Sequence, residues 1–441
     1  MTSGPVAERG LIARQWVIGL MLFGGYAACY FGRANFSVAM PLLVEELRRQ
    51  GMAADEAVVR LGGIYSLGVL AYALGKMLLG GLGDVWGGRR SFLLALGGAA
   101  VFTLAFTLGG GLPLFTLAWV GNRLTQSVGW AGLIKVTGRW FDFRTHGTVI
   151  AVLSVSYLVG DALARQSMGA LLAHGANWQT LFRFAALVLG GMFLLNFALL
   201  RESRTELGYA PAHSNPTNLY ADTASAASSV RLKDLLGPLW RSRAFKLVCL
   251  LSFGCTVVRE AFNVWMPVFL KESAGYDAAS AATFSAVFPA VGAVSVLLTG
   301  WAGDRLGVNG RPTLLFCGLA ATAMTLLALM AFEPARIGQP ATVALIGLVA
   351  FCLLGPYSYL GGAFALDFGG ARAGALASGL IDGIGYLGGT LAGSGVAHLA
   401  VAYGWRGVFM GLAAVATASA MAAGGLYATQ KRVGRSSGVG S

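Results

Sequence analysis

The sequence predicts an all-α membrane protein with twelve transmembrane helices in two six-helix halves related by pseudo-two-fold symmetry. Composition is the first reason, because 56% of the 441 residues are hydrophobic and only 12% are charged, against about 25% charged in soluble domains. Apolar runs of about 20 residues, long enough to cross a bilayer, are the second reason. The third is a phrase that occurs once in each half of the chain.

The apolar runs fall into two sets of six along the chain. The first set lies near residues 16–41, 60–82, 91–110, 114–137, 147–172 and 180–200. The second set lies near residues 245–270, 279–303, 312–333, 341–366, 374–399 and 406–428. We therefore expect an N-terminal six-helix half over 1–200, a cytoplasmic central linker over 201–243, a C-terminal six-helix half over 244–430 and a cytoplasmic tail over 431–441. Within the polar linker, a short amphipathic piece over 230–240 is expected to lie on the membrane surface.

The distribution of basic residues predicts the orientation. If both termini are inside, the cytoplasmic loops hold most of the lysines and arginines, such as Arg89, Arg90 and Arg139, and the outside segments hold few, such as Arg183 and Lys271. Cytoplasmic loops of membrane proteins are enriched in these residues. We therefore expect an integral protein of the cytoplasmic (inner) membrane with both termini in the cytoplasm. The net charge of +13 then needs no nucleic-acid partner.

One motif, R-x-x-F-x-V-x-M-P, occurs twice, at Arg33–Pro41 and at Arg259–Pro267, and we call it the repeated phrase. Four further matches recur in the same order at nearly the same offset. They are Gly80-x-x-Gly83-Asp84 with Gly300-x-x-Gly303-Asp304, Gly147 with Gly374, Tyr157-Leu158-x-Gly160 with Tyr386-Leu387-x-Gly389, and Trp178-x-x-x-Phe182 with Trp405-x-x-x-Phe409. This series predicts a parallel duplication, an architecture in which transporters hold the substrate between the halves near the middle of the membrane.

Arg33 and Arg259 are the strongest candidates for a binding site. Each lies inside an apolar run, where an arginine costs about 2.5–3.5 kcal/mol on insertion scales and is by default a functional hypothesis. Guanidinium forks match the oxygens of a phosphoryl group in a way that lysine cannot, so we expect the pair to hold one anion. The alternative is two structural ion pairs, with Glu260 as a candidate partner. Glu260 is rotated by about 100° from Arg259 on a helix, so we do not expect the two to share a face.

The motifs together resemble a known family. Gly80-x-x-Gly83-Asp84 followed by Arg89-Arg90, with its copy over Gly300–Arg305, resembles the signature loop of the major facilitator superfamily. Within that superfamily the chain is similar to the organophosphate:phosphate antiporter family, which includes glycerol-3-phosphate and hexose-6-phosphate transporters. The similar stretches are Tyr26–Arg33, Gly75–Asp84, Gln126–Trp130, Val258–Pro267, Gly355–Pro356 and Gly385–Gly389. The resemblance implies the major facilitator fold and exchange of an organic phosphate for inorganic phosphate by alternating access.

The resemblance also implies roles for individual residues. Arg33 and Arg259 match the two phosphate-binding arginines of the family, and Lys76 matches a lysine near the site. The residues that match aromatic positions of the family are Tyr26, Tyr30 and Tyr72, which would line the cavity, and Tyr386 in the eleventh span. The residues expected to act in gating, through the signature loops and not as substrate ligands, are Gly80, Gly83, Asp84, Arg89, Arg90, Gly300, Gly303, Asp304 and Arg305.

Departures from the family pattern concern an ion-pair network. Ala34 follows Arg33 where many members have a lysine, and Asn263 and Pro289 stand where the carboxylate partners of that lysine would be. Tyr157 replaces a substrate-binding histidine of the glycerol-3-phosphate members. We expect the phosphate clamp to be retained, with Tyr157 and Asn263 among the substrate-binding residues, and the choice of organic moiety to have changed.

Other charged residues inside the spans have more than one interpretation. Lys76 is expected at the site, as a second phosphate contact or as part of the gate. Asp382 is also placed among the substrate-binding residues, where it would hydrogen-bond a sugar hydroxyl, neutralise Lys76 or carry a coupling proton. Asp161 and Arg165 stand four residues apart, a spacing that favours a structural ion pair. Arg123 is left open between a site role and a structural role.

The sequence thus predicts an exchanger of a phosphorylated organic anion (sugar phosphate, glycerol phosphate or phosphoglycerate-like) for inorganic phosphate by a rocker-switch mechanism. Two alternatives stay open: a membrane sensor of a phosphorylated metabolite, and a transporter of organic carboxylates or phosphonates through the same arginines. We expect no enzymatic activity and no catalytic residues, because no nucleophile–base constellation is evident. We expect no cofactor, metal site or nucleic-acid partner. The expected partners are the anion, phosphate and membrane lipid, and the protein is expected to be monomeric.

Overall fold

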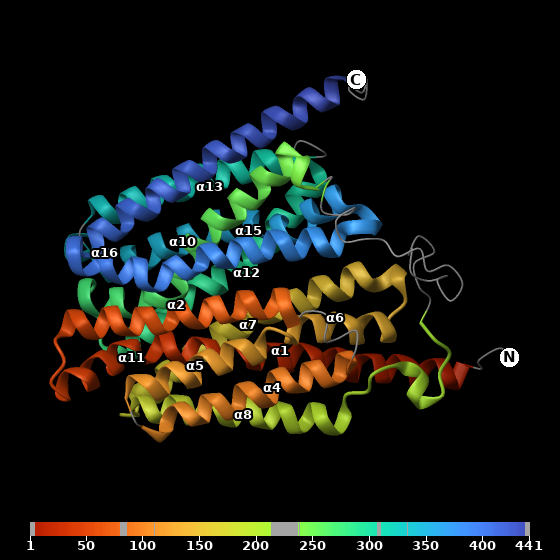
Figure 1. The fold of residues 1–441 in the computed structure, drawn as a ribbon, viewed down its shortest axis with the longest axis horizontal. Coiled ribbons are helices and arrows are strands. Elements are labelled where there is room, and N and C mark those ends of the chain that lie inside the picture. Colours follow the sequence, from red (N-terminus) through yellow and green to blue (C-terminus); the bar gives the residue numbers. More distant parts are fainter. Residues whose placement is uncertain are drawn as a thin grey trace.

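The computed structural model describes residues 5–79, 86–109, 111–212, 237, 239–306, 310–332 and 334–436. Every regular element in these ranges is a helix. Figure 1 shows the red-to-yellow-green helices α1 to α8 lying beside the green-to-blue helices α10 to α16, with both chain ends at one end of the molecule. We call these the first and the second helix group.

The bounds of the helices follow the chain order. The first group consists of α1 (Pro5–Arg49), α2 (Ala54–Leu79), α4 (Gly88–Ala105), the short 3-10 helix η1 (Phe106–Leu108), α5 (Leu112–Gln126), α6 (Gly129–Trp140), α7 (Phe143–Ala173) and α8 (Trp178–Leu199). A second 3-10 helix, η2 (Arg204–Leu207), follows it. The second group consists of α10 (Arg243–Ser273), α11 (Ala278–Ser285), α12 (Val287–Arg305), α13 (Gly310–Ala331), α14 (Pro334–Ile337), α15 (Gln339–Gly361) and α16 (Ala363–Ser436).

The described residues contain nine segments that are long and apolar enough to cross a membrane. One of them, Ala377–Thr429, holds the last two predicted spans, whereas α5, α6 and α7 are not among the nine. The all-helical membrane architecture is therefore confirmed, and the count of twelve spans stays a prediction. So do the bounds of the two halves, the linker and the tail. Within the linker, residues 213–236 and 238 lie outside the described part, and with them most of the predicted amphipathic piece.

The span expected over 114–137 is wrong as a single helix. α5 ends at Gln126 and α6 begins at Gly129. The hydroxyl of Ser127 donates to the carbonyl of Leu124 at 2.6 Å, a local bond that competes with helical hydrogen bonding. This break lies against α2, since a Cβ added to Gly75 would clash with the Ser127 side chain.

The span expected over 279–303 is also divided, into α11 and α12. α11 ends at Ser285, four residues before Pro289. A proline has no N–H to donate to the carbonyl four residues earlier, so it ends or bends a helix at that point. Ser285 and Pro289 thereby come to lie beside the cavity described below.

α16 contains the last two predicted spans in one run of 74 residues. At about 1.5 Å per residue a straight helix of that length would measure roughly 110 Å, far more than the about 40–45 Å of a whole bilayer. Gly404 lies between the two predicted spans with φ at 63°, a left-handed conformation that favours glycine. Figure 1 shows the blue chain folding back on itself, so α16 supplies two antiparallel segments.

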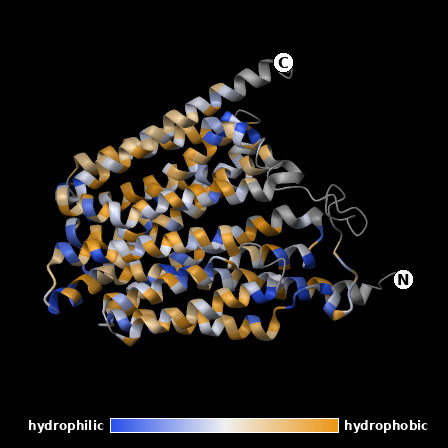
Figure 2. Ribbon diagram, in the orientation of Figure 1, coloured by the Kyte–Doolittle hydropathy of each residue, from blue (hydrophilic) through white to orange (hydrophobic). Residues whose placement is uncertain are grey.

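The surface of the helix groups is strongly apolar. Trp16, Leu78 and Leu187 are each 70% exposed or more. Figure 2 shows hydrophobic colours along the outer helices and hydrophilic colours concentrated near the helix ends. Monomeric soluble proteins rarely expose large contiguous apolar patches, so this surface fits a lipid environment.

The two helix groups are joined on the side away from the chain ends. The hydroxyl of Ser37 donates to the carbonyls of Asn263 and Val264, each at 2.8 Å. Three more bonds cross the groups there: Ser66 Oγ to the Thr390 carbonyl, Ser394 N to Ser66 Oγ and Gln166 Nε2 to the Thr283 carbonyl. We call this set of contacts the distal seam.

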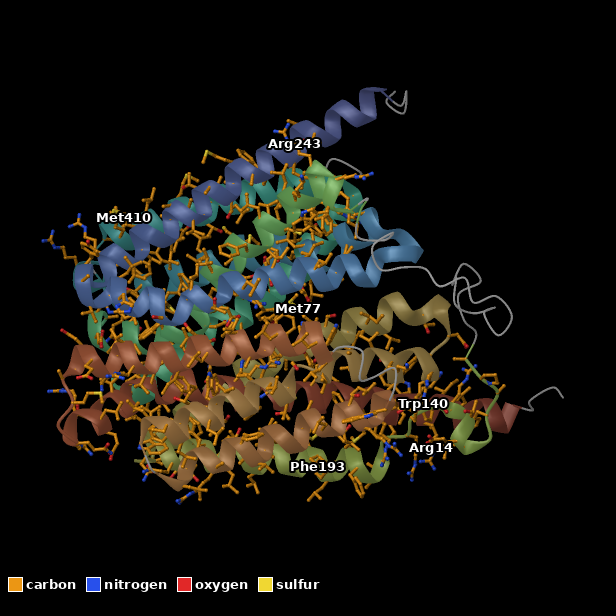
Figure 3. All side chains as sticks on the ribbon, in the orientation of Figure 1. Arg14, Met77, Trp140, Phe193, Arg243 and Met410 are labelled. Atoms are coloured by element: carbon orange, nitrogen blue, oxygen red, sulfur yellow. The ribbon has the colours of Figure 1, made fainter. Side chains whose placement is uncertain are left out.

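Close backbone packing continues the distal seam. A Cβ added to Gly62 would lie 2.8 Å from the Gly393 carbonyl, so α2 and α16 touch there without side chains between them. Figure 3 places Met77, near the opposite end of α2, between the two groups, whereas Arg14 and Trp140 lie at the end that holds the N-terminus. The cavity described below lies between the two helix groups.

Candidate functional site

A cavity of about 50 Å³ lies between the two helix groups. Because one water needs about 10–15 Å³ by this measure, it holds about three to five water-sized groups. Its lining consists of Tyr30, Arg33, Ala34, Tyr65, Arg123, Tyr157, Leu158, Asp161 and Arg165 from the first group, and Arg259, Glu260, Asn263, Phe288, Pro289, Leu354 and Tyr386 from the second. Both copies of the repeated phrase therefore contribute to one cavity.

The predicted substrate-binding residues divide into two sets. Those in the lining are Tyr30, Arg33, Tyr157, Arg259, Asn263 and Tyr386. Those behind it are Tyr26, Tyr72, Lys76 and Asp382. The rings of the second set pack on the first: the Tyr26 and Tyr30 centroids lie 6.0 Å apart, and those of Tyr72 and Tyr386 lie 5.0 Å apart.

Arg33 reaches the cavity from α1. Its Nε donates to Oε1 of Gln126 at 2.6 Å, and its Nη1 donates to the Tyr30 hydroxyl at 3.1 Å. The guanidinium also stacks on two rings, 4.6 Å from the centroids of both Tyr30 and Tyr72. Its Nη2 is buried and has no hydrogen-bond partner among the described residues. Arg33 thus has only neutral partners, and one of its nitrogens is left without a hydrogen-bond acceptor among the described residues.

Arg259 occupies the equivalent position on α10. Its Nη2 and Oε1 of Glu260 form an ion pair at 2.8 Å, which is the structural ion pair that the sequence offered as the alternative for this arginine. Their helical positions do diverge, but long flexible side chains bring the charged ends together. Glu260 also accepts from the Tyr65 hydroxyl at 2.8 Å and from Nδ2 of Asn263 at 3.3 Å. The Nε of Arg259 is buried without a partner in the described part of the chain.

Two aromatic rings surround the guanidinium of Arg259. Its Cζ lies 4.8 Å from the ring centroid of Tyr357 and 5.3 Å from that of Tyr386. Arginine over an aromatic face gains cation–π attraction, most where water is excluded. Both arginines of the repeated phrase are therefore held on aromatic faces, while their partners differ in charge.

Tyr72 contacts two arginines of the first group. The Cζ atoms of Arg33 and Arg123 are 4.6 Å and 4.8 Å from its ring centroid. Arg123 also lies 5.8 Å from the ring centroid of Trp119. Its side chain is buried, with 3% of the residue exposed. Arg123, whose role the sequence left undecided, thus belongs to the cavity lining.

Lys76 and Asp382 form an ion pair across the two groups, with Nζ and Oδ2 3.4 Å apart. Of the interpretations given to Asp382, this geometry matches neutralisation of Lys76. The ammonium also lies 5.3 Å and 5.2 Å from the ring centroids of Tyr72 and Tyr386. The pair therefore adds no net charge behind the cavity.

Asp161 and Arg165 form the expected ion pair on α7, with Nε and Oδ1 3.1 Å apart. Arg165 also donates from Nη1 to the Ser285 hydroxyl at 3.0 Å and from Nη2 to the Asn263 carbonyl at 2.7 Å. Every nitrogen of this guanidinium therefore has a partner. The expected ion pair is confirmed, and these contacts are consistent with a structural role.

Only some of the signature-loop residues belong to the described part of the chain. Gly80, Gly83 and Asp84 fall outside the described residues, and so does the side chain of Asp304. Arg89 donates from Nε to the Leu200 carbonyl at 2.7 Å, while Arg90 is exposed.

The second signature loop has fewer described contacts. Arg305 is exposed and stacks on Trp301 at 4.2 Å. A Cβ on Gly303 would clash with the Tyr359 hydroxyl, whereas Gly300 faces open space. The gating role of both loops stays a prediction.

Glu202 is an acidic partner in this region that the sequence did not indicate. Its carboxylate accepts from the backbone N–H groups of Gly88 and Arg89, at 2.9 Å and 2.6 Å, and pairs with Arg139. A carboxylate at the first turn of α4 satisfies unpaired N–H groups and complements the helix dipole.

Other residues of the site were also missed from the sequence. Gln126 begins a stretch that resembles the family, so its position was a usable signal. Tyr65 stands seven residues before Tyr72, and this spacing places both on one face of α2. Tyr357, near Arg259, has no comparable signal. Among the described residues, no cluster of three or more metal-ligating side chains is present.

Comparison with known proteins extends over most of the chain. The model of the Major Facilitator Superfamily matches residues 22–393. The probable hexose phosphate transport protein of Chlamydia pneumoniae is 26% identical over 407 residues, which cover 90% of this chain and 87% of that protein. The glycerol-3-phosphate transporter of Bacillus subtilis (strain 168) is 23% identical over 407 residues, covering 88% and 87%. The membrane sensor protein UhpC of Escherichia coli (strain K12) is 26% identical over 411 residues, covering 91% and 90%.

Solved structures share the architecture at low sequence identity. The D-xylose-proton symporter superposes with a TM-score of 0.73 at 15% identity, covering 92% of this chain and 97% of that one. The nucleoside transporter NupG superposes with a TM-score of 0.69 at 12% identity, covering 94% and 99%. At such identities these structures bear on the fold alone.

Proposed function

Because the chain belongs to the Major Facilitator Superfamily, we propose that it is a secondary active transporter that exchanges a phosphorylated organic anion for inorganic phosphate. Membership confirms the predicted fold class. The relatives named as hexose phosphate and glycerol-3-phosphate transporters are consistent with the organophosphate:phosphate antiporter family. The transporters and the sensor among the relatives also agree with the expectation of no enzymatic activity.

The arginine pair carries this proposal. Arg33 and Arg259 come from equivalent positions of the two helix groups, line one cavity and each keep a buried N–H without a partner. An unsatisfied charged donor away from water is costly. A phosphoryl group supplies several acceptor oxygens and negative charge, and charge-assisted bonds to such oxygens are the strong ones. An anion bridging the two helix groups would satisfy both arginines at once.

The exchange step follows from the charge of the site. A bound anion would neutralise buried positive charge, so the loaded protein could pass through a state closed on both sides. The empty protein would have to enclose unpaired guanidinium groups in a region where charge is expensive. This difference in barrier favours exchange over one-way transport. The distal seam and the cavity fit a rocker-switch arrangement that opens toward the end holding the termini.

The substrate class is a phosphate monoester such as a sugar phosphate, a glycerol phosphate or a phosphoglycerate-like molecule. The cavity of about 50 Å³ suits inorganic phosphate in size, and an ester would need it to widen. Tyrosines around it offer hydroxyl groups and apolar faces to the organic moiety. Tyr30, Tyr157 and Tyr386 are the residues of this kind in the lining.

The apolar helices and the bacterial relatives support an integral inner-membrane protein. We propose that the termini are cytoplasmic, on the basis of the basic loops, and that the protein works as a monomer. The surface that faces lipid is then the apolar belt of Figure 2.

A sensor function is the second candidate, because one relative is named a membrane sensor protein. Such a protein would bind the phosphorylated metabolite in the same cavity without moving it across the membrane. Phosphate exchange by purified protein would exclude a function restricted to sensing. Competition by organic carboxylates or phosphonates would test the remaining alternative.

The decisive experiment is exchange of labelled phosphate in phosphate-loaded proteoliposomes. Arg33→Lys and Arg259→Lys keep the charge but lose the planar fork, so we expect each to reduce exchange at least about a hundredfold, in line with the loss of about two charge-assisted bonds. Arg183→Lys, at an exposed position of α8, is the matched control and should retain full activity. Wild-type exchange by Arg259→Lys would overturn the proposed mechanism.

A further inference from the structure

We propose that Arg123 is a third anion-binding arginine and that it makes the site selective for the doubly charged form of phosphate and its monoesters. The inference rests on the proposed function for the chemical class of the anion. It adds a residue outside the duplicated phrase, contributed by α5 alone.

The first observation is that the guanidinium of Arg123 lacks polar partners among the described residues. Within the described part of the chain it makes no hydrogen bond or ion pair, and its Nε is buried without a partner. The residue is 3% exposed, so bulk water does not solvate it. A buried charge without compensation is costly, and such groups are normally paired.

The second observation is the contrast with Arg165 in the same cavity. All three kinds of guanidinium nitrogen of Arg165 have partners, on Asp161, Ser285 and Asn263. This is how an arginine with a structural role is held. Arg33, Arg123 and Arg259 each leave a buried nitrogen unsatisfied instead. The lining therefore contains one structural arginine and three with donors free for a ligand.

The third observation is the charge of the lining. It holds four arginines and two carboxylates, Asp161 and Glu260, which leaves a surplus of two positive charges among the described residues. The carboxylates are paired with Arg165 and Arg259. The surplus therefore lies on Arg33 and Arg123, and a doubly negative anion would neutralise it.

The structure places Arg33 and Arg123 against the same aromatic ring. They stack on the same ring, that of Tyr72, and Gln126, one turn after Arg123 on α5, accepts from Nε of Arg33. Two cations so close repel each other, more strongly where water is excluded. The ring that they share attracts each cation but carries no net charge. An anion bound to both removes the repulsion, so it completes the site.

The alternative is that Arg123 only packs between Tyr72 and Trp119. Packing explains the stacking distances but not the unsatisfied donor or the surplus charge. A packing residue of similar length would serve there without a charge. The two interpretations differ in the charge dependence of binding, and the test uses that difference.

The test measures dissociation constants of purified full-length protein by calorimetry for three probes. Glucose 6-phosphate gains its second charge near pH 6, sulfate is doubly charged throughout, and dimethyl phosphate is singly charged throughout. We expect the wild type to bind glucose 6-phosphate about tenfold or more tightly at about pH 7.5 than at about pH 5, following that ionisation. Sulfate binding should change little over this range, and dimethyl phosphate should bind weakly at both pH values.

Arg123→Gln should weaken the doubly charged probes about tenfold to a hundredfold, the loss expected for one charged hydrogen-bonding partner. It should change dimethyl phosphate binding far less. Arg123→Lys should keep the preference for the doubly charged form, because it keeps the charge. Arg183→Gln, the same change at an exposed site, should match the wild type.

Equal weakening of all three probes by Arg123→Gln would assign a structural role and overturn the inference. So would binding within twofold of the wild type. If Arg123→Gln does not fold, Arg123→Lys decides, since a lost preference for the doubly charged form contradicts the inference and a retained one supports it. Failure of the wild type to exchange phosphate would instead overturn the proposed function itself.

Discussion

Arg33 and Arg259 show that equivalent positions of a duplicated chain need not carry equivalent chemistry. Both stack on tyrosines, yet Arg33 bonds to the neutral amide of Gln126 and Arg259 to the carboxylate of Glu260. Among the described residues, Arg33 therefore has no negatively charged partner, whereas Arg259 has one in Glu260. Removing one partner of a buried ion pair costs about 3–5 kcal/mol, so Glu260 stabilises the unloaded site.

Glu260→Gln should therefore make the protein depend on its ligand. We expect a lower melting temperature without phosphate, because Arg259 loses its charged partner, and a larger stabilisation by saturating phosphate than in the wild type, because binding to the folded state shifts the unfolding equilibrium. Thermal unfolding in detergent across a phosphate titration measures both. Glu272→Gln, at the far end of α10, is a control on the same helix. The same phosphate-induced shift in Glu260→Gln and the wild type would contradict this role.

At the residue scale, the sequence identified which residues belong to the cavity better than it predicted the contacts that they make. Repetition marked Arg33 and Arg259, and the i, i+4 spacing marked Asp161 with Arg165. The pairing of Arg259 with Glu260 was considered only as the alternative, because helical geometry places Cα atoms but not the ends of long side chains. Arg123 was left open for a related reason: an arginine inside an apolar run reveals nothing about its partners until the neighbouring helices are placed.

At the scale of elements, interruptions of helices matter most. The gap between α5 and α6 follows Gln126, the residue that bonds Arg33, and the gap between α11 and α12 precedes Pro289. Hydropathy predicted both spans but neither gap, because it sums apolarity over a window and ignores local hydrogen bonding. Pro289 and Gly404 were readable signals, since proline and glycine change the backbone itself. The break at Ser127 could not be predicted, because a serine contributes the same hydropathy whether it lies inside a helix or at its end.

The start of α11 illustrates how a single carboxylate fixes an element. Asp277 Oδ1 accepts from the N–H of Ser280 at 2.9 Å, and Oδ2 accepts from its hydroxyl at 2.7 Å. These two bonds from Ser280 lower the pKa of Asp277 below its ordinary value. A lowered pKa in the folded state means that this stabilisation is present above the ordinary pKa, about 3.9, and is lost as the pH falls through the folded value.

Asp277→Ala should therefore destabilise the protein by about 0.5–2 kcal/mol at neutral pH, the usual cost of losing a helix cap. Asp277→Asn keeps the acceptor and should lose less. The difference between the wild type and Asp277→Ala should narrow as the pH falls below about 4, because the wild-type carboxylate becomes protonated there, whereas the difference between the two variants should not change with pH. Thermal unfolding at several pH values measures this, and a constant difference between wild type and Asp277→Ala down to the lowest pH would contradict it.

At the scale of the whole molecule, the distal seam fixes how the two helix groups meet. The two backbones approach each other closely at Gly62 and Gly393, where any side chain would collide with the opposite backbone or with Ser66. The repeats in the sequence predicted two groups with a site between them. They could not predict where along their length the two groups make contact, because repeats identify equivalent positions and not the tilt of one group against the other.

Gly393→Leu should wedge the distal seam open. We expect exchange to fall at least about tenfold, because a side chain forced into a packed contact typically costs about 1–3 kcal/mol. Labelling of a Ser37→Cys background by a membrane-impermeant maleimide should become faster in the same variant. Gly395→Leu is the matched control on the same helix, since its Cβ would meet only Leu391 at 4.0 Å. Unchanged labelling and unchanged exchange in Gly393→Leu would show that the seam does not act as a gate.

The chemistry of the distal seam also bears on the resting equilibrium of the protein. Its hydrogen bonds join uncharged donors mainly to main-chain carbonyls, as Ser37 and Ser66 do, and water can take over each of these partners when the groups separate. Such bonds contribute only about 1 kcal/mol each in net terms, whereas Arg165, which donates across the groups to Ser285 and to the Asn263 carbonyl, adds bonds from a charged donor. The uncharged bonds of the distal seam can therefore be exchanged for bonds to water at little net cost, and the bonds from Arg165 are the stronger hydrogen bonds that hold the two groups together.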